Sequence, residues 1–243
     1  MSLFSASDLR AADLGRRVAI FGFAAPWAGF VAAAIAAVTL ARLADHSVTL
    51  ASAGLSGLPR TPAVIIALGS DAGVQAAVVA VALAWAWRAR RGGRAADAAA
   101  RASELLRAIA FVAVSVILAA FLEESTHLLL SRPRPTVFLA TGVDEMRILG
   151  LRIFGKWGSF PSGHSARGFA LVAALWIVMP GRPWLRAVLV VTALASCAQV
   201  VMLRHFVSDV VAGAFLGVAT PSLLAALAAP FVASARRAAV SGE

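Results

Sequence analysis

The chain contains the stretch Phe160-Pro161-Ser162-Gly163-His164-Ser165, which stands directly before an apolar run. Serine is a favoured residue at a helix N-cap, and glycine lets a ligand approach the backbone closely. The N–H groups of a first helical turn have no helical acceptor, so they can bind an anion. The stretch predicts a helix start that holds a phosphate beneath the imidazole of His164. An ordinary helix start with a satisfied polar histidine would explain the same tetrapeptide by itself.

Composition places the chain in a bilayer. Of its 243 residues 60% are hydrophobic and 14% are charged, and the mean hydropathy is +0.85. These values exclude an ordinary soluble domain of this length. The apolar runs are spread evenly and no low-complexity linker divides them, which predicts a single membrane domain.

The formal net charge of +10 does not indicate nucleic-acid binding, because most cationic residues lie between apolar segments. Arginines at a membrane boundary set topology and contact anionic lipid, so we expect a lipid bilayer as the partner of these charges and no nucleic acid. The single cysteine, Cys197, lies in an apolar run and excludes both a disulfide within the chain and a metal site built on several thiolates.

The order of apolar runs predicts an all-α fold with six transmembrane spans. A short interfacial helix is expected within residues 41–61 and a long outer loop at residues 131–160, between spans three and four. We expect a cytoplasmic amino end at residues 1–17, the membrane domain at 18–234 and a cytoplasmic tail at 235–243. The spans are expected near residues 18–40, 62–87, 105–130, 165–179, 184–203 and 207–232.

Lysine and arginine counts predict the orientation of the chain. With the amino end inside, 13 of these residues lie on the inner side and 9 on the outer side. The excess on the inner side favours a cell-membrane protein with both termini in the cytoplasm and its site on the outer, periplasmic or extracellular, face. The outer cations gather around the candidate site.

Two further polar segments open on the same side as Ser162 in a six-span chain. The first ends span three and carries His127 and Arg134, whose planar guanidinium can hold two phosphate oxygens. The second carries His205 and Asp209, whose spacing of four would place both on one helix face. There the carboxylate would take one imidazole N–H and leave the other nitrogen free to attack. Membrane anchors and a structural ion pair are the alternative explanations of these residues.

Together the three segments resemble the PAP2 family, the type 2 phosphatidic acid phosphatases. The family pattern reads Lys-x6-Arg-Pro, then Pro-Ser-Gly-His, then Ser-Arg-x5-His-x3-Asp. In this chain Arg134-Pro135 ends the first part, Pro161–His164 matches the second, and His205 with Asp209 ends the third. The likeness covers roughly residues 15 to 230.

The resemblance implies an integral-membrane lipid phosphatase that needs neither a metal nor another cofactor. His205 would attack phosphorus to form a phosphohistidine, Asp209 would stabilise the imidazolium, and His164 would protonate the leaving oxygen and later activate water. The phosphate would be held by the remaining predicted substrate-binding residues: Arg134, Ser162, Gly163, His127 and Gln199.

Two of those positions depart from the family pattern. His127 stands where the family has lysine, and Gln199 stands where it has arginine. Both changes remove a fixed positive charge from a phosphate site. Glu123 or Glu124, one helical turn before His127, would favour the imidazolium form and restore part of that charge. We also expect a bound phosphate to be contacted by at least one of three other cations: Lys156, Arg167 and Arg204.

The expected substrate is a membrane lipid with an exposed phosphate monoester or diphosphate. Two alternatives remain: a phosphotransferase between lipids, and a catalytically weakened binder of lipid phosphates. In the long loop, apolar residues from Met146 to Phe154 would rest on the bilayer, while Asp144, Glu145, Arg147 and Lys156 would select a headgroup. Asp71, in the second expected span, matches no motif position, and no seam of small residues predicts a dimer, so the oligomeric state stays open.

Overall fold

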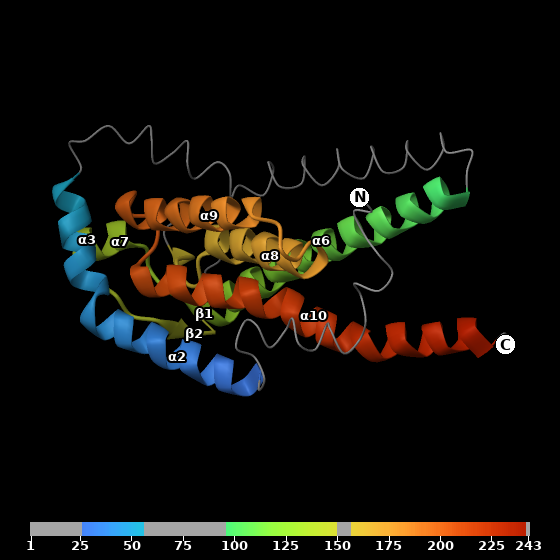
Figure 1. The fold of residues 1–243 in the computed structure, drawn as a ribbon. Coiled ribbons are helices and arrows are strands. Elements are labelled where there is room, and N and C mark those ends of the chain that lie inside the picture. Colours follow the sequence, from blue (N-terminus) through green and yellow to red (C-terminus); the bar gives the residue numbers. More distant parts are fainter. Residues whose placement is uncertain (1–25, 56–95, 150–156, 242–243) are drawn as a thin grey trace.

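The computed structural model describes residues 26–55, 96–149 and 157–241, and this part of the chain is predominantly helical. The helices are α2 (Pro26–Leu43), α3 (Asp45–Gly54), α6 (Ala96–Leu129), α7 (Pro135–Thr141), α8 (Gly163–Val178), α9 (Trp184–Val201) and α10 (Val207–Ser241), and two short strands are β1 (Leu130–Ser131) and β2 (Arg147–Ile148). Figure 1 shows α6, α8, α9 and α10 running along the long axis of the molecule, with α3 and α7 at one end.

Three described helices have stretches long and apolar enough to cross a membrane: Ser103–Leu129, Trp184–Val201 and Val207–Ala228. The segment Ala32–Leu43 and the helix α3 meet at a bend of 54° and together pass the same test, which would make a fourth. The 16-residue helix α8 is apolar but shorter. The second expected span at 62–87, with Asp71, lies outside the described residues. The helical membrane character is therefore confirmed, and the count of six spans stays a prediction.

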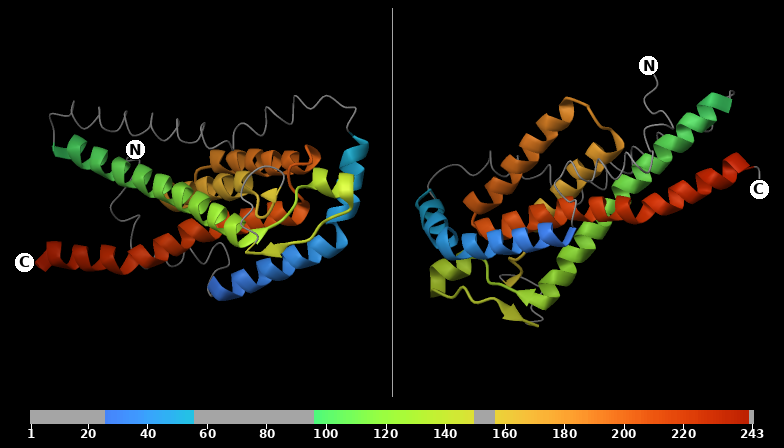
Figure 2. Two further views of the ribbon diagram at one scale, coloured as in Figure 1. Left: turned by 180° about the vertical axis from the view of Figure 1, so that it is seen from behind. Right: turned by 60° about the horizontal axis from the view of Figure 1, so that its bottom comes forward.

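Helix α8 occupies the centre of the described bundle, where it packs against α6, α9 and α10 (Figures 1 and 2). Its inner surface is made of small residues, and Ala166, Ala170 and Ala174 are fully buried. Small side chains let helix backbones approach closely, and in a bilayer this close packing replaces the hydrophobic effect as the main attraction between helices. The outer surfaces of α6 and α9 are apolar instead, with Ile117, Phe121 and Val190 exposed as expected for lipid-facing positions.

Two glycines fix the contact between α10 and α8. Gly213 and Gly217 lie one turn apart on α10, and a Cβ on either would collide with a backbone carbonyl oxygen, that of Ser162 or Ala166. This Gly-x-x-x-Gly pair was not singled out from the sequence, because the pattern does not say whether its partner helix belongs to the same chain. In this protein the pair places the first turn of α10 directly against the start of α8.

The loop between α6 and α8 is more ordered than the sequence predicted. It contains α7 and a two-stranded antiparallel ladder that pairs Leu130 with Ile148 and Ser131 with Arg147, so the described fold is not purely α-helical. The ladder folds the loop back onto the end of α6. A short helix was expected within residues 41–61, and α3 lies there with Asp45, Thr49 and Ser52 buried. Its location at the membrane interface stays a prediction.

We predict that Gly217→Ala destabilises the protein by about 1–3 kcal/mol, because the added methyl group overpacks the contact with Ala166 and with Ala170, whose backbone nitrogen would lie 2.9 Å away. Thermal unfolding in detergent measures the effect. Gly54→Ala is the matched control, since a Cβ there meets nothing within 4 Å. Equal melting temperatures for the wild type and Gly217→Ala would contradict the close packing of these helices.

Candidate active site at the start of α8

The predicted phosphate cradle is the N-terminal turn of α8. The helix begins at Gly163 and Ser162 is its N-cap, with an extended backbone and a side chain that accepts from the Ser165 N–H. The amides of Gly163 and His164 thus belong to a first helical turn, where N–H groups lack helical acceptors. Gly163 is required for a reason beyond ligand access: a Cβ there would lie 2.6 Å from a carboxylate oxygen of Glu123.

Contacts from all three motif segments hold this turn. The Ser162 N–H donates to the Asp209 carbonyl over 2.9 Å, and His127 Nε2 lies 2.9 Å from the Pro161 carbonyl oxygen. One residue earlier, the Ser159 N–H donates to the Arg132 carbonyl over 3.1 Å. The end of α6, the turn before α8 and the start of α10 therefore converge at one end of the bundle, as the sequence predicted.

His205 lies in the turn between α9 and α10 with only 6% of its surface exposed. Its Nδ1 is 2.7 Å from the Ser159 carbonyl oxygen. Because a carbonyl only accepts hydrogen bonds, Nδ1 carries the hydrogen, and Nε2 of the neutral ring carries the lone pair. The imidazole is thereby fixed in the tautomer that a nucleophile at Nε2 requires.

Burial lowers the pKa of His205 to about 3, and the hydrogen bond to Ser159 opposes this shift only in part. The nearby His164, Arg134 and His127 lower the pKa further by charge repulsion. The ring is therefore neutral over the physiological pH range, and the charge of His164 is near enough to influence its pKa.

Asp209 does not take the imidazole hydrogen, which corrects the expectation from the spacing of four. Asp209 Oδ2 lies 3.9 Å from His205 Nδ1. It accepts instead from the Phe206 N–H over 2.8 Å and from the Ser159 hydroxyl over 2.5 Å. The physical reason is that α10 begins at Val207, so His205 precedes the helix and the two residues do not share a helical face. Asp209 closes the first turn of α10 as a reach-back cap and acts on His205 through Ser159.

Arg134 and Gln199 carry buried polar atoms that no described group satisfies. Arg134 Nε and both side-chain polar atoms of Gln199 lack a hydrogen-bond partner, and Gln199 is 0% exposed. Burial and the positive charge of Arg204 lower the pKa of Arg134, so the two arginines lie near each other. Buried polar groups without partners are rare in proteins, and the two donors among these atoms, Arg134 Nε and Gln199 Nε2, are of the kind that an anion would satisfy.

His127 is engaged by protein groups on both ring nitrogens. Nε2 donates to Pro161, and Nδ1 lies 3.2 Å from Glu123 Oε1 and 3.7 Å from Glu124. The contact with Glu123 needs a proton on one partner, and Arg167 lies 3.2 Å from the other oxygen of Glu123. His127 therefore clamps the turn before α8, and Arg167 belongs to the same cluster. Lys156 lies outside the described residues.

The same three side chains could hold a metal ion. Ligand atoms of Glu123, Glu124 and His127 all lie within 4.8 Å of one another, a grouping that the sequence interpretation did not raise. Arg167 already neutralises one of the carboxylates. A metal would have to bind beside this guanidinium, which makes the set a poor fit for a divalent cation.

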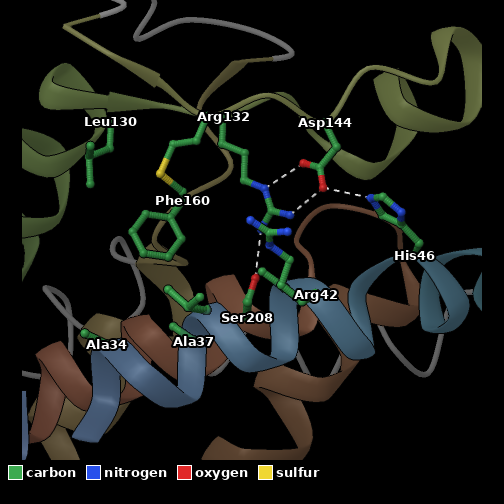
Figure 3. Close-up of a pocket in the computed structure, with 12 residues that line it drawn as sticks. Ala34, Ala37, Arg42, His46, Leu130, Arg132, Asp144, Phe160 and Ser208 are labelled. Carbon is green, nitrogen blue, oxygen red and sulfur yellow. Dashed lines mark hydrogen bonds and ion pairs between the residues drawn. The ribbon is translucent and has the colours of Figure 1, made fainter. Parts of the chain in front are cut away.

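A cavity of about 480 Å³ lies beside the site, between α2 and the loop that follows α6. Arg132 and Ser208 form its polar wall, as Figure 3 shows, and Phe160 borders it. Asp144 and Arg42 line it as well, but none of the predicted catalytic residues does. The cavity is therefore lined by neighbours of the cradle and not by the predicted catalytic side chains themselves.

Sequence reasoning missed the residues that hold this layer. No site role was predicted for Arg132, Asp45 or Ser159, and Asp144 was expected to select a headgroup. An ionisable residue at a membrane segment is by itself a candidate for a functional site, and Asp45, shortly after the first apolar run, is such a residue. Exposed Ile148 and Leu149 do match the predicted contact of the loop with the bilayer.

Comparison with known proteins supports the arrangement. The family described as the PAP2 superfamily matches residues 108–232. No curated protein matches the chain. The fold is similar to that of a solved structure described as the first transmembrane PAP2 type phosphatidylglycerolphosphate phosphatase from Bacillus subtilis, with a TM-score of 0.53 and 18% identity over 82% of this chain and 93% of that one.

The matched residues 108–232 begin within α6, end within α10 and include every motif position discussed above. At 18% identity the solved structure supports the fold alone, whereas the family match extends over half of the chain. With the three motif segments meeting at the start of α8, the chain belongs to the PAP2 superfamily.

Proposed function

We propose that the protein is an integral-membrane lipid phosphatase that hydrolyses a phosphate monoester or diphosphate through a phosphohistidine at His205. The observation that carries the proposal is the contact of His205 Nδ1 with the Ser159 carbonyl. It leaves Nε2 unprotonated, and the Ser159 backbone that accepts from Nδ1 leads within four residues to the first turn of α8, where an anion would bind.

In the first step His205 Nε2 attacks phosphorus and the bond from phosphorus to the leaving oxygen breaks, while His164 donates a proton to that oxygen. In the second step His164 takes a proton from water, the water oxygen attacks phosphorus and the bond to Nε2 breaks. His205 and His164 return to their initial states, and inorganic phosphate leaves. Because His205 starts neutral, its attack needs no prior deprotonation.

The equatorial oxygens of the phosphoryl group would be held by Arg134, by the amides of Gly163 and His164, and by the side-chain amide of Gln199. The first turn of α8 provides the two backbone N–H groups. Arg134 Nε and Gln199 Nε2 are buried donors without a described acceptor. His127 serves in this scheme as a positioning residue, since its nitrogens contact Pro161 and Glu123.

The substrate class follows from the location of the site at the end of apolar helices. A lipid phosphate would keep its tails beside the bundle while its headgroup reaches α8. The relative from Bacillus subtilis is named as a phosphatase of phosphatidylglycerolphosphate, which supports the class without fixing the lipid. Within this proposal the chain crosses the bilayer six times, both termini are cytoplasmic and the site is on the outer face.

The buried, uncharged Gln199 favours one alternative, a lipid-phosphate binder with weak turnover. A second alternative, transfer of the phosphoryl group from His205 to another lipid, uses the same residues and differs only in the acceptor of the second step.

We predict that the purified protein releases phosphate from at least one of three substrates, phosphatidic acid, phosphatidylglycerol phosphate or a polyprenyl diphosphate, and that EDTA does not stop the release. His205→Ala should lower turnover by about 10³-fold or more, because it removes the nucleophile. Measurement of released phosphate and of lipid products separates the three functions. Transfer to lipid without release indicates the phosphotransferase, and binding without turnover indicates the binder. Loss of activity in EDTA would instead point to a metal at Glu123, Glu124 and His127.

We predict that Arg204 supplies the cation that Gln199 does not, because its charge already acts on Arg134. Arg204→Gln should then lower kcat/KM by about 10²-fold, the usual loss when one donor to the transition state is removed. The double variant Gln199→Arg with Arg204→Gln should recover most of that loss. The matched control is Arg186→Gln at the opposite end of α9, which should leave kcat/KM unchanged. Activity of Arg204→Gln equal to that of the wild type would reject this role.

We predict that His205 stays neutral well below the usual range of histidine. With a pKa of about 3, roughly 1% of this imidazole is protonated at pH 5, whereas an unperturbed histidine would be mostly charged. Any decrease of kcat/KM between pH 8 and pH 5 must therefore come from the protonation of a group other than His205. Nitrogen NMR of protein labelled in histidine, assigned by comparison with His205→Asn, should show the neutral Nδ1–H tautomer from pH 8 to pH 5. An imidazolium signal from His205 at pH 6 would contradict the burial argument.

A further inference from the structure

Asp45, the first residue of α3, is 0% exposed although it carries a carboxylate. It accepts from the Ser208 N–H over 2.9 Å, from the Ser208 hydroxyl and from Arg132 Nη2 over 3.0 Å. A buried carboxylate is costly unless such donors surround it. All of its partners belong to the segments that carry the proposed active site.

Arg132 joins Asp45 to that site. Its side chain is 4% exposed and donates from Nη1 to Asp209 Oδ1 over 2.8 Å, while Nε and Nη2 donate to the two oxygens of Asp144. The guanidinium also lies 3.9 Å from the centre of the Phe206 ring. Figure 3 shows it enclosed between Asp144 and Ser208. The hydrogen bonds to Asp144 and the three nearby carboxylates raise the pKa of Arg132 despite its burial.

A continuous series of contacts leads from Arg132 to the nucleophile. Asp209 receives Arg132 on Oδ1 and the Ser159 hydroxyl on Oδ2, over 2.8 and 2.5 Å. The Ser159 carbonyl then accepts from His205 Nδ1 over 2.7 Å. The orientation of the imidazole thus depends on Ser159, and that of Ser159 on Asp209 and Arg132.

Three carboxylates, those of Asp45, Asp144 and Asp209, share the one guanidinium of Arg132. Asp144 is the most exposed of them and is also bound by His46 over 2.9 Å. Asp45 and Asp144 both accept from Arg132 Nη2. Without Asp45, only Asp144 would attract this nitrogen, and the guanidinium could turn toward Asp144 and away from Asp209. Asp45 and its bond to Ser208 hold Nη1 in the direction of the catalytic corner.

We propose that Asp45 is a positioning residue of the phosphoryl-transfer site, which aligns His205 through Arg132, Asp209 and Ser159. This inference rests on the proposed phosphatase function and extends its site to the amino-terminal helices, since Asp45 lies outside the matched residues 108–232. Asp45 contacts no reacting atom. Its removal is therefore expected to change the attack on phosphorus more than the binding of phosphate.

The test uses the full-length protein in detergent with Asp45→Ala, Asp45→Asn and Ser208→Ala. Asparagine keeps an oxygen for the Ser208 N–H but loses the charge that holds Arg132, whereas Ser208→Ala keeps the contact between Asp45 and Arg132. The matched control is Glu104→Gln, a carboxylate near the start of α6, at the end of that helix away from His127. For each protein we would measure kcat, KM and melting temperature, and the protection against unfolding by inorganic phosphate and by orthovanadate.

We expect kcat to fall by about 10²-fold in Asp45→Ala and Asp45→Asn, the effect of misplacing a reacting group by about 1 Å. KM should change by less than roughly threefold, because Arg134 and the α8 amides stay in place. Ser208→Ala should lose less activity, and Glu104→Gln none. Orthovanadate, a phosphate analogue that can bond to the attacking nitrogen, should protect Asp45→Ala less than the wild type, while phosphate should protect both equally.

Values of kcat within twofold of the wild type in both Asp45 variants would overturn the inference. Equal loss of protection by phosphate and by orthovanadate, together with a lower melting temperature, would also overturn it, because Asp45 would then only stabilise the fold. If the wild type released phosphate from no lipid, the phosphatase proposal would fail by itself. The comparison of phosphate with orthovanadate would still decide whether Asp45 aligns His205.

Discussion

The hydrogen bond from His205 Nδ1 to the Ser159 carbonyl is the contact on which the rest of the site depends. It fixes the tautomer of an imidazole that burial keeps neutral, and it gives the orienting role to a backbone group. A backbone acceptor cannot rotate away as a side chain can, but it is only as well placed as its loop. In the proposed mechanism the position of that loop is therefore a catalytic requirement, and the surrounding contacts hold the loop in place.

The turn before α8 is held by contacts that differ in kind. The glycine pair of α10 allows backbone to meet backbone without a side chain between them, and the Ser162 N–H donates to the Asp209 carbonyl. His127 clamps Pro161 from α6, and Asp209 receives the hydroxyl of Ser159. Close packing sets the distance between the helices, and the polar contacts set their register. Neither would suffice alone, because small apolar surfaces can slide along each other whereas directional hydrogen bonds cannot.

The sequence was sufficient to predict the parts of the fold and site that depend on local patterns. Apolar runs predicted the positions of α6, α8, α9 and α10, and Ser162 was identified as an N-cap because capping is a property of neighbouring residues. The pairing of side chains could not be predicted in this way, because it depends on which residues the three-dimensional fold brings together. The spacing of His205 and Asp209 suggested a direct contact, but the start of α10 at Val207 excludes it. The layer of Asp45, Arg132 and Asp144 joins residues 12 to 87 positions apart, which no local pattern reveals.

The replacement of two family cations by His127 and Gln199 acquires a physical meaning from these contacts. A lysine at position 127 would offer a compact point charge, whereas the imidazole donates to Pro161 and contacts Glu123, so this position holds the turn before α8. Gln199 keeps donor capacity without charge, and no described group pairs with its buried side-chain amide. In the proposed phosphatase this amide donates to a phosphoryl oxygen, and leaving such a buried donor unpaired would cost about 1–3 kcal/mol. The proposed site therefore relies at this position on a contact formed on binding, and its long-range attraction for phosphate comes from Arg134 and the neighbouring Arg204.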